Sequence, residues 1–247
     1  MASRGAALVT GGTRRIGRAL VVAAADAGYD VAIHCRVVDD AAEATAAEVR
    51  ARGRRAAILA SDLRKESTSV ALIGEAEAEL GPVTLLVNSA SVFEHDAFAG
   101  MNRASWDAHM ETNLRAPLVL AQVFARRLPA DRQGLIVNIL DQRVLRPQPD
   151  FFSYSLSKSA LWEATRMLAQ ALAPRIRVNG IGPGPTLPSI HQAPGEFEAE
   201  AQASLLARPV TPQALAQALR YLIDAEFVTG QMIAVDSGQH LSFGTLP

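Results

Sequence analysis

The chain has 247 residues, of which 49% are hydrophobic and 20% charged, and its net charge is −1. This balance is typical of a globular protein and provides no excess of positive charge for nucleic acid or an anionic membrane. The single cysteine, Cys35, excludes an internal disulfide, and the five histidines lack metal-ligand spacing. No apolar run reaches the roughly 18 residues of a membrane span, and the first residues do not resemble a signal peptide. We therefore expect a cytoplasmic protein without a metal site.

Short apolar runs alternate along the chain with stretches whose apolar residues recur every three or four positions. The runs predict seven buried strands, at 6–10, 31–34, 56–60, 85–88, 135–139, 176–181 and 232–235. The stretches between them predict helices at 18–27, 41–52, 67–80, 105–128, 152–173 and 211–224. Gly28, Gly53 and Gly81 stand where helices should end, and Thr211-Pro212 is typical of a helix start.

Strict alternation of strands and helices predicts a doubly wound parallel sheet with helices on both faces, the Rossmann arrangement. No linker or repeat interrupts the pattern, so we expect one domain over residues 1–247. The longest irregular stretch, at about 182–196, follows the sixth strand and contains four prolines. Loops of this length after a strand usually cover a site, so this segment is a candidate substrate loop.

The turn after the first strand has the sequence T-G-G-T-R-R-I-G. Its glycines allow the backbone to approach a pyrophosphate, and the next helix directs its N-terminal N–H groups there. Such turns also occur for steric reasons alone, but the position in the first strand-to-helix turn favours a dinucleotide site. The predicted cofactor contacts in this turn are Gly11, Thr13, Arg14, Arg15, Ile16 and Gly17.

The second strand lacks the terminal acid that usually binds the ribose 2′-hydroxyl of NAD, and ends instead in His34-Cys35-Arg36. Arg36, helped by Arg14, could hold a 2′-phosphate through charge-assisted hydrogen bonds. The alternative is that both are solvated surface arginines. The sequence thus favours NADPH over NADH, with His34, Cys35 and Arg36 as cofactor contacts.

Tyr154 and Lys158 form a Tyr-x-x-x-Lys motif in a predicted helix. The chain has three tyrosines and only two lysines, so a chance match is expected about 0.02 times. At this spacing both side chains lie on one face of the helix, where an ammonium should pull the phenol below its usual pKa of about 10. Tyr154 could then donate a proton near neutral pH. A surface contact between an aromatic ring and a cation is the alternative.

Together these motifs resemble the short-chain dehydrogenase/reductase family over nearly the whole chain. Further matches are Ser61-Asp62-Leu63, Asn88-Ser89-Ala90, Asn113 and Pro183-Gly184. The resemblance implies that Asp62 and Leu63 border the adenine of the cofactor, that the Asn88 segment and Pro183-Gly184 line it, and that Lys158 holds the nicotinamide ribose. It also implies a homotetramer built on the helices of Asn113 and Tyr154.

The resemblance also implies a proton relay that runs through a water molecule held by the backbone of Asn113. Pro117 lies four residues later and has no N–H, so the Asn113 carbonyl would lack its helical partner and could hold that water. Core packing could equally explain Pro117.

Two positions depart from the usual family pattern. Asp141 stands thirteen residues before Tyr154, where the family usually has a serine that donates to a substrate carbonyl. An ionised carboxylate cannot donate and opposes a developing oxyanion, but it suits a substrate with N–H groups. Arg15 stands where the family has glycine. Asp141 as a turn residue is the alternative explanation of the first departure.

With Ser91 and Phe93, these departures resemble the pteridine reductase and dihydromonapterin reductase branch of the family. That resemblance implies that Phe93 stacks on a pterin, that Ser91 and Arg15 hold pterin or phosphate, and that Asp141 with Tyr154 supplies the proton for C=N reduction. Phe93 could instead fill the core beneath the 182–196 loop. A carbonyl reductase and a non-catalytic NADPH-binding protein remain alternatives, although the intact Tyr154/Lys158 pair disfavours the latter.

Overall fold

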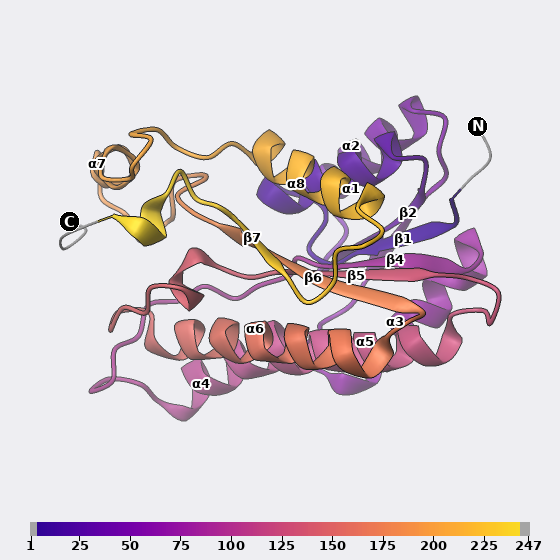
Figure 1. Ribbon diagram of the computed structural model, residues 1–247, viewed down its shortest axis with the longest axis horizontal. Coiled ribbons are helices and arrows are strands. Elements are labelled where there is room, and N and C mark those ends of the chain that lie inside the picture. The colour runs from indigo at the N-terminus through magenta and orange to yellow at the C-terminus, as the bar shows by residue number, and fades with distance from the viewer. Residues whose placement is uncertain (1–3, 243–247) are drawn as a thin grey trace.

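The computed structural model describes residues 4–242. Its centre is a seven-stranded parallel sheet in the order β3-β2-β1-β4-β5-β6-β7, with helices on both faces (Figure 1). The strands are β1 (Ala6–Val9), β2 (Asp30–Cys35), β3 (Ala56–Ala60), β4 (Val83–Asn88), β5 (Gly134–Ile139), β6 (Ile176–Pro183) and β7 (Met232–Val235). Each of the seven predicted strands is present with ends within two residues of the prediction, because each apolar run is short and bounded by polar or glycine residues.

The helices form two layers. On one face lie α1 (Arg15–Asp26), α2 (Asp40–Ala51) and α8 (Pro212–Asp224), and on the other α3 (Glu66–Leu80), α4 (Arg103–His109), α5 (Ala116–Arg127) and α6 (Phe152–Leu172) (Figure 1). Thr211 caps α8 through its side chain and Asp39 caps α2. The short helix α7 (Glu196–Gln202) lies beyond one end of the sheet and was not predicted. Among residues 4–242, no helix is long and apolar enough to cross a membrane.

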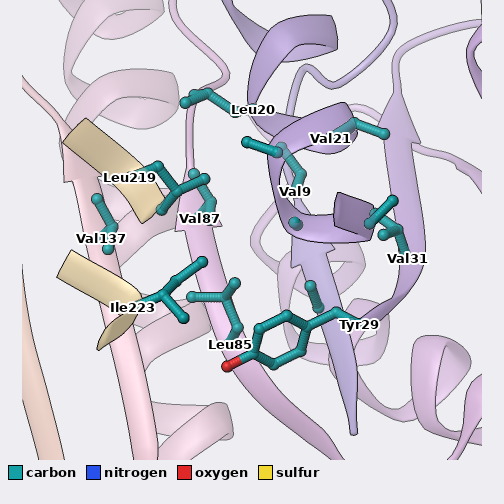
Figure 2. Close-up of a cluster of buried hydrophobic side chains, with 14 of the residues drawn as sticks. Val9, Leu20, Val21, Tyr29, Val31, Leu85, Val87, Val137, Leu219 and Ile223 are labelled. Carbon is teal, nitrogen blue, oxygen red and sulfur yellow. The ribbon is translucent and has the colours of Figure 1, made fainter. Parts of the chain in front are cut away.

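Each face of the sheet has its own apolar core. Toward α1 and α8, strand residues such as Val9, Leu85 and Val137 meet Leu20 and Leu219 of the helices (Figure 2). Toward α3 and α5, a second cluster includes Leu8, Leu86, Leu72 and Phe124. Both clusters are almost fully buried, and burial stabilises each such side chain by about 1.5–3 kcal/mol. Strands covered on both faces explain why their sequences are continuously apolar.

The predicted helix at 105–128 is interrupted, which corrects that prediction. Between α4 and α5 the chain forms a π-helical segment, Met110–Arg115, and the N–H of Ala116 donates to the carbonyl of Glu111 five residues earlier. Pro117 has no N–H to continue the α-helical ladder at the next position. Asn113 therefore lies within a π-helical turn, a conformation that is frequent at functional sites.

The crossovers from β1 and β4 leave toward opposite faces of the sheet, so a crevice opens at the carboxyl ends of these neighbouring strands. The turn after β1, the segment after β4 and the segment after β5 all converge there. This edge of the sheet is where a ligand is expected in a doubly wound fold.

Candidate active site

A cavity of about 700 Å³ lies at the carboxyl end of the sheet. It brings together many of the predicted site residues, namely Arg15, Ile16, Ser89, Ser91, Phe93, Asp141, Tyr154, Lys158, Pro183 and Gly184. The 182–196 segment forms one wall, although β6 extends to Pro183 and α7 begins at Glu196. The remaining predicted residues are not among those that line this cavity.

The turn after β1 packs too tightly for side chains. A Cβ at Gly11 would lie 2.9 Å from the Cα of Ala90, and Gly11 has φ +63°. A Cβ at Gly17 would lie 2.0 Å from the carbonyl oxygen of Gly11. Thr10 also holds the turn against the segment that follows β4, because its Oγ1 accepts hydrogen bonds from the N–H groups of Ser89 and Ala90, both at 3.0 Å. This close packing leaves bare backbone at the N-terminus of α1, and no side chain caps that helix. The residues therefore fit a dinucleotide pyrophosphate.

His34 lies beneath this turn and not on its surface. The ring is buried, and its Nδ1 accepts from the N–H of Gly11 at 3.3 Å while Nε2 lies 3.1 Å from the carbonyl of Ser61. Burial lowers the pKa of His34, which favours the neutral ring with its proton on Nε2. His34 thus connects the turn after β1 to the residue that follows β3. Cys35 is also buried, and burial raises the pKa of its thiol.

The two arginines predicted to meet a 2′-phosphate differ in their surroundings. Arg14 pairs with Asp39, the residue that caps α2. Arg36 is exposed and forms no ion pair with any other residue in the described range 4–242. Thr13 is buried, and its carbonyl accepts from Thr45 in α2. Of the two guanidinium groups, that of Arg36 is therefore the more available to a ligand.

The residues after β3 and β4 are held by separate networks. Arg64 binds the carboxylate of Asp62 through its side chain and lowers the pKa of Asp62 to about 2. Leu63 is buried next to it. Asn88 donates to Asn138 of β5 at 2.8 Å, and its Oδ1 has no hydrogen-bond partner among the described residues.

The side chain of Asn113 holds the segment that leads to Phe93. Its Oδ1 accepts from the N–H of Val92 at 2.8 Å and from Ser91 Oγ at 3.2 Å. Its Nδ2 donates to the carbonyl of Val92 and to Ser157 Oγ in α6. The sequence pointed to the backbone of Asn113 and gave no sign of this contact. The buried amide fixes the position of Ser91 relative to α6.

Tyr154 and Asp141 form the central pair of the cavity. The phenol donates to Asp141 Oδ2 at 2.7 Å, and Asp141 Oδ1 accepts from the N–H of Arg143 at 2.8 Å. Burial raises the pKa of Asp141. Burial and the adjacent carboxylate raise the pKa of Tyr154 well above its usual value.

The expected lowering of the Tyr154 pKa by Lys158 is wrong in this structure. Lys158 Nζ donates to the carbonyl of Ile139 at 2.8 Å, and it lies 5.8 Å from the centre of the Tyr154 ring. The group next to the phenol oxygen is therefore a carboxylate, which disfavours the phenolate. Burial lowers the pKa of Lys158 itself to about 8.

Aromatic rings form a wall beside this pair. Phe93 stacks on Phe151 with centroids 4.2 Å apart and planes 7° from parallel. The rings of Phe93 and Tyr154 meet edge to face with centroids 4.7 Å apart. Phe151 has φ +51°, and the guanidinium of Arg143 lies 5.3 Å from its ring centre. Arg143 also pairs with Asp150 at 2.7 Å. Phe93 was predicted, whereas Phe151, Arg143 and Asp150 were missed because no short motif marks them.

Two side chains fasten the 182–196 segment over the cavity. Arg15 donates to the carbonyls of Leu187 and Pro188 at 3.1 and 3.0 Å. His191 Nε2 lies 3.0 Å from the carbonyl of Phe93 on the opposite wall. Arg15 has φ +50°, a left-handed conformation that glycine adopts more easily. The departure from glycine at this position thus adds a side chain that reaches the loop.

Known proteins share this fold and much of this sequence. The sequence model of the short chain dehydrogenase family matches residues 5–199. Two crystal structures of FolM alternative dihydrofolate reductase 1, each with NADP, are similar to this chain. The structure from Brucella canis has 46% sequence identity and a TM-score of 0.94, and the match covers 99% of this chain and 97% of the other. The structure from Brucella suis has 47% sequence identity and a TM-score of 0.94, and the match covers 99% of this chain and 98% of the other. A 3-oxoacyl-[acyl-carrier-protein] reductase, FabG from Staphylococcus epidermidis, is 28% identical over 95% of this chain and 98% of its own. The chain therefore belongs to the short-chain dehydrogenase/reductase family of oxidoreductases, whose members use a nicotinamide cofactor.

Proposed function

We propose that this protein is an NADPH-dependent reductase that reduces a C=N bond of a pterin. The observation that carries this proposal is the hydrogen bond from Tyr154 to Asp141 at 2.7 Å, where most family members have a serine in place of the aspartate. The pair lies in the cavity beside the stacked rings of Phe93 and Phe151. Acceptor oxygens next to a flat aromatic surface suit a planar heterocycle that carries N–H groups.

The cofactor site we propose runs from the turn after β1 into the cavity. Gly11, Gly17 and the free N-terminus of α1 would hold the pyrophosphate, and Arg36 the 2′-phosphate. Asp62 and Leu63 would border the adenine, while Asn88, Ser89 and Ala90 together with Pro183 and Gly184 would line the remainder. Lys158 would bind the nicotinamide ribose. The nicotinamide, when bound, supplies the hydride.

Proton delivery is then a task for the protein's own side chains. Tyr154 would donate from its phenol oxygen to the ring nitrogen of the substrate. Asp141, which accepts the hydrogen bond of the phenol, would hold the Tyr154 oxygen in position and, together with Tyr154, supply the proton. The other lone pairs of Asp141 would accept N–H groups of the pterin. The raised pKa of Tyr154 makes the neutral phenol, which is the donor form, dominant near neutral pH.

Phe93 would supply the flat face on which the pterin stacks, with Phe151 supporting it from behind. Ser91 and Arg15 would contribute hydrogen bonds at the same edge of the cavity. We also propose that residues 182–196 act as the substrate loop of a single-domain chain. Their attachment to Arg15 and His191 supports this role, because both contacts keep the loop over the cavity.

A carbonyl reductase of the same fold is the second candidate. It is favoured by the similarity to a 3-oxoacyl-[acyl-carrier-protein] reductase over 95% of this chain. Asp141 opposes it, because a carboxylate at this position repels the oxyanion that forms from a ketone. A non-catalytic role is disfavoured by the intact set of Asp141 and the buried Tyr154 and Lys158. The family resemblance further supports a cytoplasmic protein that forms a homotetramer through the helices carrying Asn113 and Tyr154. Light scattering would test the number of subunits.

The decisive experiment follows NADPH absorbance with a dihydropterin, a fully oxidised pterin and simple ketones, using wild type and Asp141→Ser. We expect wild type to use at least one pterin. The serine variant should lose roughly 10²-fold in kcat/KM for that pterin while its activity on ketones stays equal or rises. NADPH binding should change little. A wild-type protein that reduces ketones well and no pterin would overturn the proposal.

A further inference from the structure

Helix α6, which carries Tyr154, begins without a side-chain cap of its own. Its N-cap residue, Phe151, has φ +51° and makes no side-chain hydrogen bond to the first turn. The first N–H groups of an α-helix have no partners within the helix. Here the N–H of Phe152 donates to the carbonyl of Asp96 at 3.1 Å, and the N–H of Ser153 donates to Asp96 Oδ1 at 3.0 Å. The segment after β4 therefore holds the first turn of α6.

A buried chain of hydrogen bonds runs from this contact to α4. Ser153 Oγ donates to Asp96 Oδ2 and lies 2.6 Å from His109 Nδ1. The other ring nitrogen, Nε2, accepts from the backbone N–H of Glu94 at 3.2 Å. The hydrogen of the neutral ring is therefore on Nδ1 and is donated to Ser153. Ser153 and His109 are each 0% exposed, and neither belongs to a sequence motif of the site described above.

The charge states of the two ends suit this chain. Burial lowers the pKa of His109, which favours the neutral ring. Burial opposes the ionisation of Asp96, but hydrogen bonds from Ser153 and Ser105 outweigh it and lower the pKa of Asp96. Ser105 Oγ, in α4, donates to Asp96 Oδ2 at 3.0 Å. Near neutral pH an imidazole N–H thus donates to the hydroxyl of Ser153, and that hydroxyl donates to a carboxylate.

His109 contacts both of the aromatic residues that the proposed reaction uses. Its ring meets the ring of Tyr154 edge to face, with centroids 6.1 Å apart. Glu94, whose N–H it binds, directly follows Phe93 in the sequence. Phe93 and Tyr154 line the cavity, whereas His109 is not among the lining residues. One buried imidazole therefore connects the backbone beside Phe93 with the first turn of the helix that carries Tyr154.

We propose that His109 and Ser153 are positioning residues that fix Tyr154 relative to Phe93 for proton transfer. Ser153 and Asp96 hold the first turn of α6 and with it the phenol, while His109 Nε2 holds the backbone next to Phe93. The inference rests on the proposed function, since it takes Tyr154 as the proton donor and Phe93 as the face on which the substrate stacks. Such placement matters because a shift of about 1 Å can lower the rate by about 10²-fold.

The first test compares two serine variants on either side of Tyr154. Ser153→Ala breaks the chain between His109 and Asp96. Ser155→Ala is the matched control, because its hydroxyl is also buried but has no hydrogen-bond partner among the residues that the structure describes. kcat, KM and Tm are measured, with NADPH and whichever pterin or ketone wild type reduces best. We expect Ser153→Ala to lower kcat by roughly tenfold with little change in KM for NADPH, and Ser155→Ala to behave as wild type.

Two variants at position 109 separate the two hydrogen bonds of the imidazole. His109→Asn places an amide nitrogen near Nδ1 and can still donate to Ser153, whereas His109→Gln places an amide oxygen near Nε2 and can still accept from Glu94. We expect His109→Asn to keep kcat and to raise KM for the substrate severalfold, because the backbone beside Phe93 is released. His109→Gln should lower kcat and leave this KM nearly unchanged. A purely structural role would lower the Tm of both variants and leave the kcat of the folded protein unchanged.

A further measurement does not depend on turnover. The chain contains three tyrosines, so protein with tyrosine isotope-labelled at Cζ gives few NMR signals, and Tyr154→Phe identifies the signal of Tyr154. Its chemical shift depends on the hydrogen bond from the phenol to Asp141. Ser153→Ala should move this signal, and Ser155→Ala should leave it at the position of wild type.

The outcomes separate this inference from the proposed function. The inference is wrong if Ser153→Ala matches Ser155→Ala in kcat or in the Tyr154 signal. If Ser153→Ala does not fold, the two variants of His109 decide, and equal effects of both on kcat and KM overturn the inference. If wild type reduces a ketone and no pterin, the pterin assignment is wrong and the same kinetics still test the positioning. If wild type reduces neither, the proposed function is wrong, and the Tyr154 signal alone supports or overturns the role of Ser153.

Discussion

Tyr154 donates its phenol proton to the carboxylate of Asp141, and each of these groups has a raised pKa. Burial is the main cause for both, and the negative charge of Asp141 adds to the effect on Tyr154. A proton is therefore retained on this pair at higher pH than on either group in water. Such shifts are common where a protein must deliver a proton.

Asp141→Asn should make the protein more stable and less active at the same time. The folded pKa of Asp141 is raised above its unfolded value, so its contribution to stability is present at low pH and is lost as pH rises through the folded pKa. Asparagine carries no charge and avoids this loss. We expect a higher Tm than wild type at pH 8, a difference that shrinks toward pH 4, and kcat lower by roughly 10²-fold. Equal melting temperatures at pH 8 would show that ionised Asp141 imposes no cost on folding.

Tyr154→Phe should retain NADPH binding and lose turnover. Phenylalanine keeps the ring that packs against Phe93 but has no proton to donate, so kcat should fall by roughly 10² to 10⁴-fold. Cofactor titration and steady-state kinetics measure the two quantities separately. Tyr221→Phe is the control, since Tyr221 is exposed on α8. If Tyr154→Phe keeps most of its kcat, the proton comes from another group, and Asp141 is the next candidate.

Lys158 should give the enzyme an alkaline limit near pH 8. Burial lowers the pKa of Lys158 to about 8, so its ammonium form, which would bind the ribose, is lost above this pH. Because its folded pKa is depressed below the unfolded value, deprotonation itself should raise stability between about pH 8 and 10. Lys158→Arg remains charged, and its pH profile of kcat/KM for NADPH should therefore lose the limb near pH 8. A limb at the same pH in both proteins would assign it elsewhere.

Arg36→Ala should reduce the preference for NADPH over NADH. Loss of charge-assisted hydrogen bonds to a 2′-phosphate should lower kcat/KM for NADPH by roughly tenfold or more, and kcat/KM for NADH should change little. Arg14→Ala should have a smaller effect because Arg14 is paired with Asp39. Arg50→Ala removes an exposed arginine on α2 as a further control. An unchanged NADPH to NADH ratio in Arg36→Ala would remove Arg36 from the cofactor site.

The sequence predicted the sheet well because its information is local. Each strand is a short apolar run, and helix ends carry chemical signals such as Thr211-Pro212 and Gly81. The helix at 105–128 was predicted without its π-helical turn, because apolar residues every three or four positions occur on both sides of Met110–Arg115. The seven-residue α7 lies just after a proline-rich segment and has too few apolar positions to be recognised.

Several contacts in the cavity join residues that are far apart in the sequence, and local sequence patterns do not predict such contacts. Tyr154 and Lys158 could be predicted because their spacing is chemically meaningful within one stretch of chain, and Asp141 because it stands where the family usually has a serine. Glu200 and Gln239 are 39 positions apart, and their side chains meet only in the folded state. The same is true of Arg15 and the carbonyls of Leu187 and Pro188, which lie more than 170 positions away. The direction of the Tyr154 pKa shift was also beyond the sequence, because it depends on which charge lies next to the phenol oxygen.

The π-helical turn between α4 and α5 also determines how the side chains of α4 are rotated about the helix axis relative to those of α5. An α-helix turns about 100° per residue, and a π-turn accommodates one additional residue, so the side chains of α4 are rotated by that angle relative to an unbroken helix. This offset allows His109 to reach Ser153 in α6 while Phe124 of α5 joins the core beneath the sheet. Removing one residue from Met110–Arg115 would therefore redirect the whole of α4 and carry His109 away from the first turn of the helix that presents Tyr154.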